Sequence, residues 1–228
     1  MKVGVVVFPG SNCDRDAAHA ARLAGAEAEL LWHETPDLRG ADAVILPGGF
    51  AHGDYLRAGA IARFSPIMGA VREHARRGGL VLGICNGFQV LTEAGLLPGV
   101  LRRNTTLRFE HRWVTLAVER RDTPFTHLVP EGTTLRLPIA HGEGSYWLPD
   151  ESLDELEAAG RIVFRYAGPE GNPNGSARDI AGVIDEAGRV CGLMPHPERA
   201  SEELLGSADG LLLMRSLVES MARVEAAA

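Results

Sequence analysis

Apolar segments of strand length alternate with amphipathic segments of helix length along the first part of the chain. Residues 2–8 are almost continuously apolar, which is typical of a parallel strand buried on both faces. The expected strands are 2–8, 26–32, 43–46 and 80–82, and the expected helices are 14–23, a segment within 60–77 that Pro66 disturbs, and 88–94. This alternation predicts an α/β fold with a doubly wound, mostly parallel sheet.

The pattern changes after the helix at 88–94. Short apolar segments at 100–118, 134–139 and 161–166 read as strands with little helix between them. Residues 183–184 and 190–194 predict a hairpin around a turn at 186–188, and 204–224 predicts a closing helix with one apolar side. We expect the short strands to form an antiparallel excursion at the sheet edge, so that residues 1–228 make a single domain.

Composition and charge narrow the class of protein. The 228 residues are 45% hydrophobic and 23% charged, as in soluble globular proteins, and the formal net charge is −7. That charge argues against a nucleic-acid partner, which would need concentrated positive charge. No apolar run reaches bilayer-spanning length, and a first strand that begins at Lys2 leaves no secretory signal before it. We therefore expect no membrane partner.

The number and spacing of the cysteines, and the single lysine, also argue against some kinds of site. Cys13, Cys85 and Cys191 are odd in number and far apart, which suits neither a disulfide framework nor a zinc cluster. A reducing, cytoplasmic location is the best fit, and we expect no metal site. Lys2 is the only lysine, so the chain has no G-x-x-x-x-G-K-[ST] phosphate loop with which to handle ATP alone.

The most informative segment is 80–89, which reads L-V-L-G-I-C-N-G-F-Q. A strand that enters G-x-C-x-G and continues into a helix predicts a nucleophile elbow with Cys85 at its tip. Gly83 and Gly87 would leave room for this sharp turn, and the start of the helix would favour a thiolate. An ordinary tight turn with a buried cysteine is the alternative that the motif leaves open.

A base for this thiol is predicted near the end of the chain. In Met194-Pro195-His196-Pro197-Glu198 the prolines favour an extended segment, in which His196 and Glu198 face the same side. The preceding strand would place them at the carboxyl edge of the sheet. We therefore predict a Cys85-His196-Glu198 triad, although a salt-bridged loop histidine would have the same signature. A second His-x-Glu, at 141–143, lies between glycines, and we prefer the first.

Pro47-Gly48-Gly49-Phe50 ends another expected parallel strand. Adjacent glycines allow a backbone amide to approach a reacting atom closely. We expect the amides of Gly49 and Asn86 to form an oxyanion hole, and a simple strand-ending turn is the alternative. Cys13 is the rival nucleophile, because it too follows a strand and a glycine turn near a helix start, but it lacks the flanking glycines.

The P-G-G turn, the G-x-C-x-G-x-Q elbow and the late H-x-E, in this order, resemble the class I glutamine amidotransferases across essentially the whole chain. The segments F-P-G-S-N-C-D-R-D, P-I-A-H-G-E-G, N-P-N-G-S and M-P-H-P-E-R resemble in particular the glutaminase subunits of phosphoribosylformylglycinamidine synthase. The resemblance implies a flavodoxin-like sheet and a glutaminase that takes ammonia from glutamine for de novo purine synthesis. It also implies a large synthetase subunit that holds ATP and Mg²⁺, and a small bridging subunit.

The resemblance assigns further residues by position. Gly48, Gln89 and Asn104 would contact glutamine, while His141, Glu143 and the loop 172–176 would face the synthetase subunit. Two other classes share parts of the pattern: a cysteine peptidase-like hydrolase on the same fold, and a binding module with a decayed site. The glutaminase subunit of another ammonia-using synthase is a further alternative.

Overall fold

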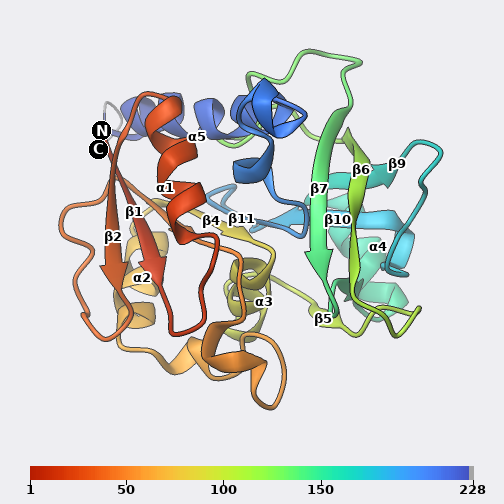
Figure 1. The fold of residues 1–228 in the computed structure, drawn as a ribbon, viewed down its shortest axis with the longest axis horizontal. Helices are drawn as coiled ribbons and strands as arrows, with labels where there is room; N and C mark the ends of the chain where they lie inside the picture. The colour runs from red at the N-terminus through yellow and green to blue at the C-terminus, as the bar shows by residue number, and fades with distance from the viewer. Residues whose placement is uncertain (226–228) are drawn as a thin grey trace.

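The computed structural model describes the backbone of residues 1–225 and the side chains of residues 1–222. Within the described residues it contains a nine-stranded sheet in the order β2-β1-β3-β4-β11-β10-β9-β6-β7, and a separate two-stranded sheet formed by β5 and β8 (Figure 1). The strands are β1 (Lys2–Val7), β2 (Glu27–Trp32), β3 (Ala43–Leu46), β4 (Leu80–Ile84), β5 (Val100–Arg102), β6 (Glu110–Val118), β7 (Leu135–His141), β8 (Ser145–Trp147), β9 (Ile162–Ala167), β10 (Ile180–Ile184) and β11 (Val190–Leu193).

The large sheet is parallel at one end and antiparallel at the other. Strands β2, β1, β3, β4 and β11 run parallel, and each step from β11 through β10, β9 and β6 to β7 is antiparallel. Strands β3, β4 and β11 are buried at every position, as their continuous apolar sequences predict, whereas the edge strand β2 is mostly exposed or half-buried. The predicted mostly parallel α/β sheet with an antiparallel excursion is confirmed.

The helices of the described residues are α1 (Asp14–Leu23), α2 (Ile67–Arg76), α3 (Asn86–Glu93), α4 (Asp150–Ala158) and α5 (Asp209–Glu225). All of them except α4 contact strands of the parallel part of the sheet, and α4 lies at the antiparallel end (Figure 1). Helices α1 and α5 contact each other, whereas α3 contacts β3, β4 and β11. The strand order reverses at β1, and right-handed crossovers on the two sides of a reversal place their helices on opposite faces. No helix in residues 1–225 is long and apolar enough to cross a membrane.

The structure corrects several predicted boundaries. The segment 100–118 is two strands in different sheets, separated by a loop in which Leu107 has a φ of 56°. Helix α5 begins at Asp209 instead of residue 204, because Gly206, with a φ of 106°, ends a short 3-10 turn at Glu203–Leu205. Helix α4 was not predicted, although Asp150 and Glu151 in its first turn are a normal start signal.

The carboxyl ends of β1, β3, β4 and β11 lie at the same edge of the sheet, because these strands are parallel neighbours. Leu193 of β11 is in register with Ile84 of β4. The segments that follow these two strands therefore emerge side by side. In open α/β sheets this edge, near the reversal of strand order, is where ligands bind.

Candidate active site

Cys85 stands at a strained turn between β4 and α3. Its φ of 49° and ψ of −104° are unfavourable for a residue with a Cβ, and its side chain is buried. The flanking glycines are a steric necessity. A Cβ on Gly87 would lie 1.9 Å from the carbonyl oxygen of Leu46, and one on Gly83 would lie 2.4 Å from Leu91 Cδ1. The local geometry is therefore that of a nucleophile elbow.

The start of α3 presents free backbone amides beside this sulfur. Asn86 is the first residue of the helix, so its amide has no acceptor within the helix. The Asn86 side chain is buried and accepts a hydrogen bond from the amide of Ala51 at 3.0 Å. This contact ties the start of α3 to the segment after β3, which carries the other predicted oxyanion residue.

His196 and Glu198 form a buried pair directly after β11. The distance between His196 Nδ1 and Glu198 Oε1 is 2.6 Å, and both side chains are almost inaccessible to solvent. The backbone amide of His196 donates to the carbonyl of Pro138 on β7, which fixes the segment against the antiparallel half of the sheet. Burial by itself would lower the pKa of His196, but the charge of Glu198 and then that of Cys85 hold it well above its ordinary value.

The Cys85 thiol is not hydrogen-bonded to His196 in the structure. It donates instead to the carbonyl of Ala140 on β7 over 3.7 Å. His196 Nε2, the ring nitrogen that does not face Glu198, is buried and has no hydrogen-bond partner among the described residues. A proton acceptor thus lies unengaged near the sulfur, as is common in ligand-free sites whose hydrogen bonds tighten when substrate binds.

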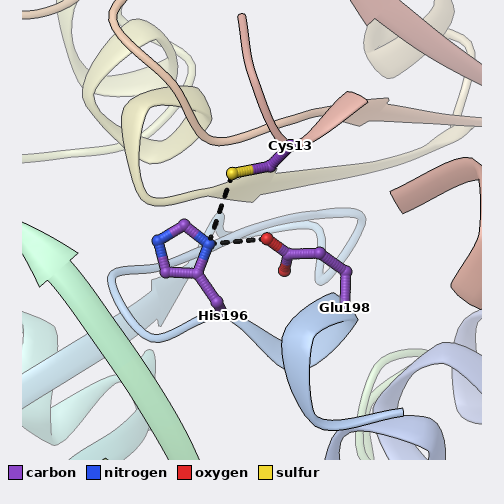
Figure 2. Close-up of side chains that lie close together, drawn as sticks. All are labelled: Cys13, His196 and Glu198. Carbon is purple, nitrogen blue, oxygen red and sulfur yellow. Dashed lines mark hydrogen bonds and ion pairs between the residues drawn. The ribbon is translucent and has the colours of Figure 1, made fainter. Parts of the chain in front are cut away.

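Cys13 also reaches His196, but at the other ring nitrogen. Its sulfur lies 3.9 Å from His196 Nδ1, and Arg199 Nη2 donates to it at 2.9 Å. Figure 2 shows one ring nitrogen facing both Cys13 and Glu198, while the other points away from them. Burial raises the pKa of the Cys13 thiol, and its backbone lacks the positive φ of an elbow.

The two glycines after β3 lie against the same group of residues. Gly49 has a φ of 149°, and a Cβ there would lie 2.7 Å from the Cα of Ser11. Its amide donates no hydrogen bond to any described residue. The carbonyl of Gly48 accepts from the amides of Asn12 and Cys13, and a Cβ on Gly48 would lie 2.6 Å from the His196 ring. Gly48 therefore allows close packing against the histidine.

A cavity of about 150 Å³ opens beside the Cys85 sulfur. Of the predicted site residues, Gly49, Cys85 and Gln89 line it. Its other lining residues are Phe50, Asp54, Phe109, Ala140, His141, Gly142 and Glu143. Asp54 and Phe109 lie in loops with no recognisable motif and were not predicted, and Phe50 was named only as the end of the Pro47-Gly48-Gly49-Phe50 turn.

Gln89 and Asp54 are joined to the elbow through one amide. Asn86 Nδ2 donates to Gln89 Oε1 at 2.9 Å and to Asp54 Oδ1 at 3.2 Å. Gln89 Nε2 in turn donates to the carbonyl of Glu143 at 2.6 Å. Burial, then the nearby Glu143 carboxylate, raise the pKa of Asp54 to about 6. One wall of the cavity is therefore acidic.

Asn104 lies behind the cavity wall instead of in it. Its side chain is fully buried and donates to the carbonyls of Arg108 and His141, and its oxygen accepts from the amide of Gly144 at 3.0 Å. These bonds occupy both ends of the amide. Asn104 thus fixes the loop that carries Gly142 and Glu143 and has no free polar atom directed at a ligand.

The expectation that His141 and the loop 172–176 face a partner is wrong for two buried residues. His141 is 3% exposed, and Asn174 is fully buried and donates to His141 Nε2 at 3.4 Å. Burial lowers the pKa of His141 to about 4, so the ring is neutral near pH 7 and supports the cavity wall. Gly142 and Gly144 suggested a solvated loop, whereas Gly144 allows close packing, because a Cβ there would lie 2.3 Å from the His141 ring.

Similarity to known proteins shows to which family the chain belongs. Residues 1–209 match the family model of the CobB/CobQ-like glutamine amidotransferase domain. The phosphoribosylformylglycinamidine synthase subunit PurQ of Rubrobacter xylanophilus is 61% identical over 96% of this chain and 98% of its own length. The PurQ subunit of Thermus thermophilus is 56% identical over 98% of this chain and all of its own length.

The chain belongs to the PurQ family of glutamine amidotransferases. A solved structure of PurLQS from Thermotoga maritima includes a chain that is 45% identical, with a TM-score of 0.88, over 96% of this chain and 98% of that one. A putative GMP synthase subunit from Thermoplasma acidophilum, with a TM-score of 0.70 and 14% identity, shares the fold. The match to the family model, over residues 1–209, spans both halves of the sheet and the positions of the site described above.

Proposed function

We propose that this chain is the glutaminase subunit of a phosphoribosylformylglycinamidine synthase, with Cys85 as its nucleophile. The supporting observation is the strained Cys85 at the start of α3, next to the buried pair formed by His196 and Glu198. Relatives that match along their full length carry the name of this synthase subunit. The cavity at the sulfur, about 150 Å³, is of the right order for one amino acid.

The geometry supports a two-step reaction. Binding of glutamine draws the Cys85 thiol away from the Ala140 carbonyl, and His196 Nε2 takes its proton. The thiolate attacks the side-chain amide carbon, and the amides of Gly49 and Asn86 stabilise the oxyanion. His196 then protonates the departing ammonia and, through the same nitrogen, activates the water that hydrolyses the thioester to glutamate.

The other residues hold the substrate and the base in place. Glu198 keeps His196 oriented and favours its charged form while the thiolate exists. Gln89 and the acidic wall formed by Asp54 and Glu143 face the end of the cavity where the α-ammonium group of glutamine would lie. We assign Asn104 and Gly48 to supporting these contacts instead of binding glutamine directly, because neither lines the cavity.

The ammonia acceptor belongs to another chain. The solved structure with the most similar chain described above is a PurLQS assembly. We propose that this chain likewise assembles with a large synthetase subunit, which binds ATP and Mg²⁺, and with a small bridging subunit. The absence of a phosphate-loop sequence agrees with this division of labour. Residues 1–228 act as a single glutaminase domain in this assembly.

Replacing Cys85 by serine in the assembled synthase tests the assignment. Formation of formylglycinamidine ribonucleotide from glutamine should fall by at least ~10³-fold, because a hydroxyl replaces the thiolate nucleophile. Synthesis from added ammonium chloride should persist at the wild-type rate. Cys191→Ala, which removes a thiol buried in β11, is the matched control and should retain both activities. Equal loss of the two activities in Cys85→Ser would contradict the proposal.

A further inference from the structure

Three side chains of types that bind zinc, Cys13, His196 and Glu198, converge at one nitrogen of His196. Potential ligand atoms of Cys13, His196 and Glu198 all lie within 4.8 Å of one another, although the residues come from the loop after β1 and the segment after β11 (Figure 2). Thiolate, imidazole and carboxylate are the ligands of zinc in proteins. No local sequence signal indicates this group, because Cys13 is far from the other two residues in the chain.

Two separations among the three ligand atoms can be compared with those around a tetrahedral ion. Bonds of ~2.3 Å to sulfur and ~2.0–2.1 Å to nitrogen and oxygen imply separations of roughly 3.6 Å between sulfur and nitrogen and roughly 3.3 Å between nitrogen and oxygen. The Cys13 sulfur lies 3.9 Å from His196 Nδ1, and Nδ1 lies 2.6 Å from Glu198 Oε1. An ion bound to Nδ1 would take the place that Oε1 now occupies, so the Glu198 carboxylate has to turn aside and present an oxygen from another direction.

Two other observations point to a ligand at this place. The second carboxylate oxygen of Glu198, Oε2, is buried and has no partner among the described residues, so the carboxylate can turn toward an ion without breaking another contact. A cavity of about 230 Å³ is lined by Cys13, His196 and Arg199 among others, and so adjoins two of the three ligands. It gives an ion a way in and leaves room for water as a fourth ligand.

We propose that Cys13 Sγ, His196 Nδ1 and a Glu198 carboxylate oxygen form a site for Zn²⁺ or another soft divalent cation, and that its occupation switches the glutaminase off. Binding releases the thiol proton of Cys13 to solvent, and the Nδ1 proton of His196 passes through solvent to Nε2, so that the ring stays a neutral imidazole while S–Zn and N–Zn bonds form. The ion takes the place of the hydrogen bond between His196 and Glu198. His196 can then no longer become the imidazolium partner of the Cys85 thiolate. This inhibitory consequence rests on the proposed function, whereas the binding itself does not.

The positive charge of Arg199, beside the Cys13 sulfur, opposes binding of a cation at this site. Its Nη2 donates to the Cys13 sulfur at 2.9 Å, and its Nε lies 3.7 Å from Asp16 Oδ2. The guanidinium is one-third exposed, so it can swing toward Asp16 and solvent when an ion binds. Arg199→Gln should therefore tighten zinc binding, while Arg15→Gln, at an exposed position on α1, should leave it unchanged.

Cobalt spectroscopy on the full-length chain tests the site independently of glutaminase activity. Co²⁺ should bind in a 1:1 ratio with a near-ultraviolet thiolate-to-cobalt charge-transfer band, and Zn²⁺ should displace it. Cys13→Ala should abolish the band and weaken zinc binding in calorimetry by ~100-fold or more. Cys85→Ala and Cys191→Ala should retain the band. Absence of the band in the wild type, or its loss in Cys85→Ala but not in Cys13→Ala, would overturn the proposal.

A measurement on the unaltered protein covers the case in which Cys13→Ala does not fold. Zn²⁺ should slow alkylation of Cys13 by iodoacetamide, mapped by mass spectrometry, and equal rates with and without zinc would refute the site. In the assembled synthase, zinc should lower the rate of glutamate release relative to the rate of the same protein without metal. Tight zinc binding at Cys13 without inhibition would overturn the switch.

Discussion

One carboxylate determines how His196 can act. Glu198 is buried, its Oε1 lies 2.6 Å from the ring, and no positively charged side chain of the described residues pairs with it apart from His196. In surroundings of low polarity the charge of Glu198 is the largest of the contributions that keep the pKa of the imidazole well above its ordinary value despite burial. The charge of the base and its orientation therefore depend on the same contact.

We expect Glu198→Gln to lower glutamine-dependent turnover of the assembled synthase by ~10³- to 10⁴-fold, because the amide neither fixes the ring nor stabilises its charged form. The pKa of His196, followed by NMR of labelled histidine, should fall. Glu202→Gln is the matched control, because Glu202 also pairs with a histidine, His19 at 2.7 Å, but on the surface. An unchanged histidine titration in Glu198→Gln would show that the pair does not set the charge.

Among single residues of the site, the sequence predicted those whose immediate neighbours in the chain mark them. Cys85 lies between glycines whose Cβ atoms would clash, and His196 lies between prolines, so each carries its structural requirement in its neighbours. Asp54 and Phe109 have no such neighbours. They reach the cavity only because the loops after β3 and β5 fold over the same edge of the sheet, which a linear pattern does not reveal.

The segment that follows β3 is the most unusual element of the site. Between residues 52 and 56, His52, Gly53, Asp54 and Leu56 all have positive φ values of 52° to 69°. Left-handed conformations cost free energy in residues with a Cβ, so the segment persists because its contacts hold it. Asn86 provides two of them, with the amide of Ala51 and the carboxylate of Asp54.

Asp54 makes the stability of this segment depend on pH. Its pKa is about 6 in the folded protein and 3.8 in a model compound, so the folded state holds the proton more tightly. The contribution of this proton to the free energy of unfolding is complete below about pH 4 and is lost as the pH rises through 6. Asp54→Asn cannot ionise, and it should gain ~1–2 kcal/mol in unfolding free energy relative to wild type at pH 8 but not at pH 4.

Urea unfolding at the two pH values measures this difference. Asp37→Asn, at an exposed position on another loop, is the control and should show no comparable change between them. If Asp54→Asn is equally stable relative to wild type at both pH values, the carboxyl group is not held in its protonated form by the fold.

The alternation of strands and helices made the parallel half of the sheet predictable, because each buried strand is a short, continuous apolar run. The antiparallel half was harder. Strands β6 and β7 alternate buried with exposed or half-buried positions, and their partners are set by long-range pairing that no local signal encodes. Helix α4 was missed because its two buried leucines, Leu153 and Leu156, make a weak apolar stripe.

For the whole molecule, the structure is that of a site not yet aligned for catalysis. The Cys85 thiol is directed at Ala140, and His196 Nε2 is unengaged. Large apolar side chains near the cavity, Phe50, Tyr55, Leu56 and Phe109, are 45% to 89% exposed. A partner that covers them could also change the conformation of the turn at Cys85. Glutaminase activity would then depend on assembly.

We therefore expect the isolated chain to hydrolyse glutamine slowly, and the synthetase with its ligands to raise glutamate release by ~5- to 150-fold, the usual range of coupling between sites. Glutamate measured with and without the partner tests this, and a complex carrying Cys85→Ser controls for hydrolysis by the partner. Full activity of the isolated chain would contradict the coupling.

The adjacency of β4 and β11 has a consequence for how the protein is made. The ribosome makes Cys85 well before His196, and β11 must insert between β4 and β10 before the two can meet. A nascent or prematurely terminated chain thus carries a sulfhydryl with no imidazole to deprotonate it. If Cys85 and His196 act as proposed, a copy that stops before His196 consumes no glutamine.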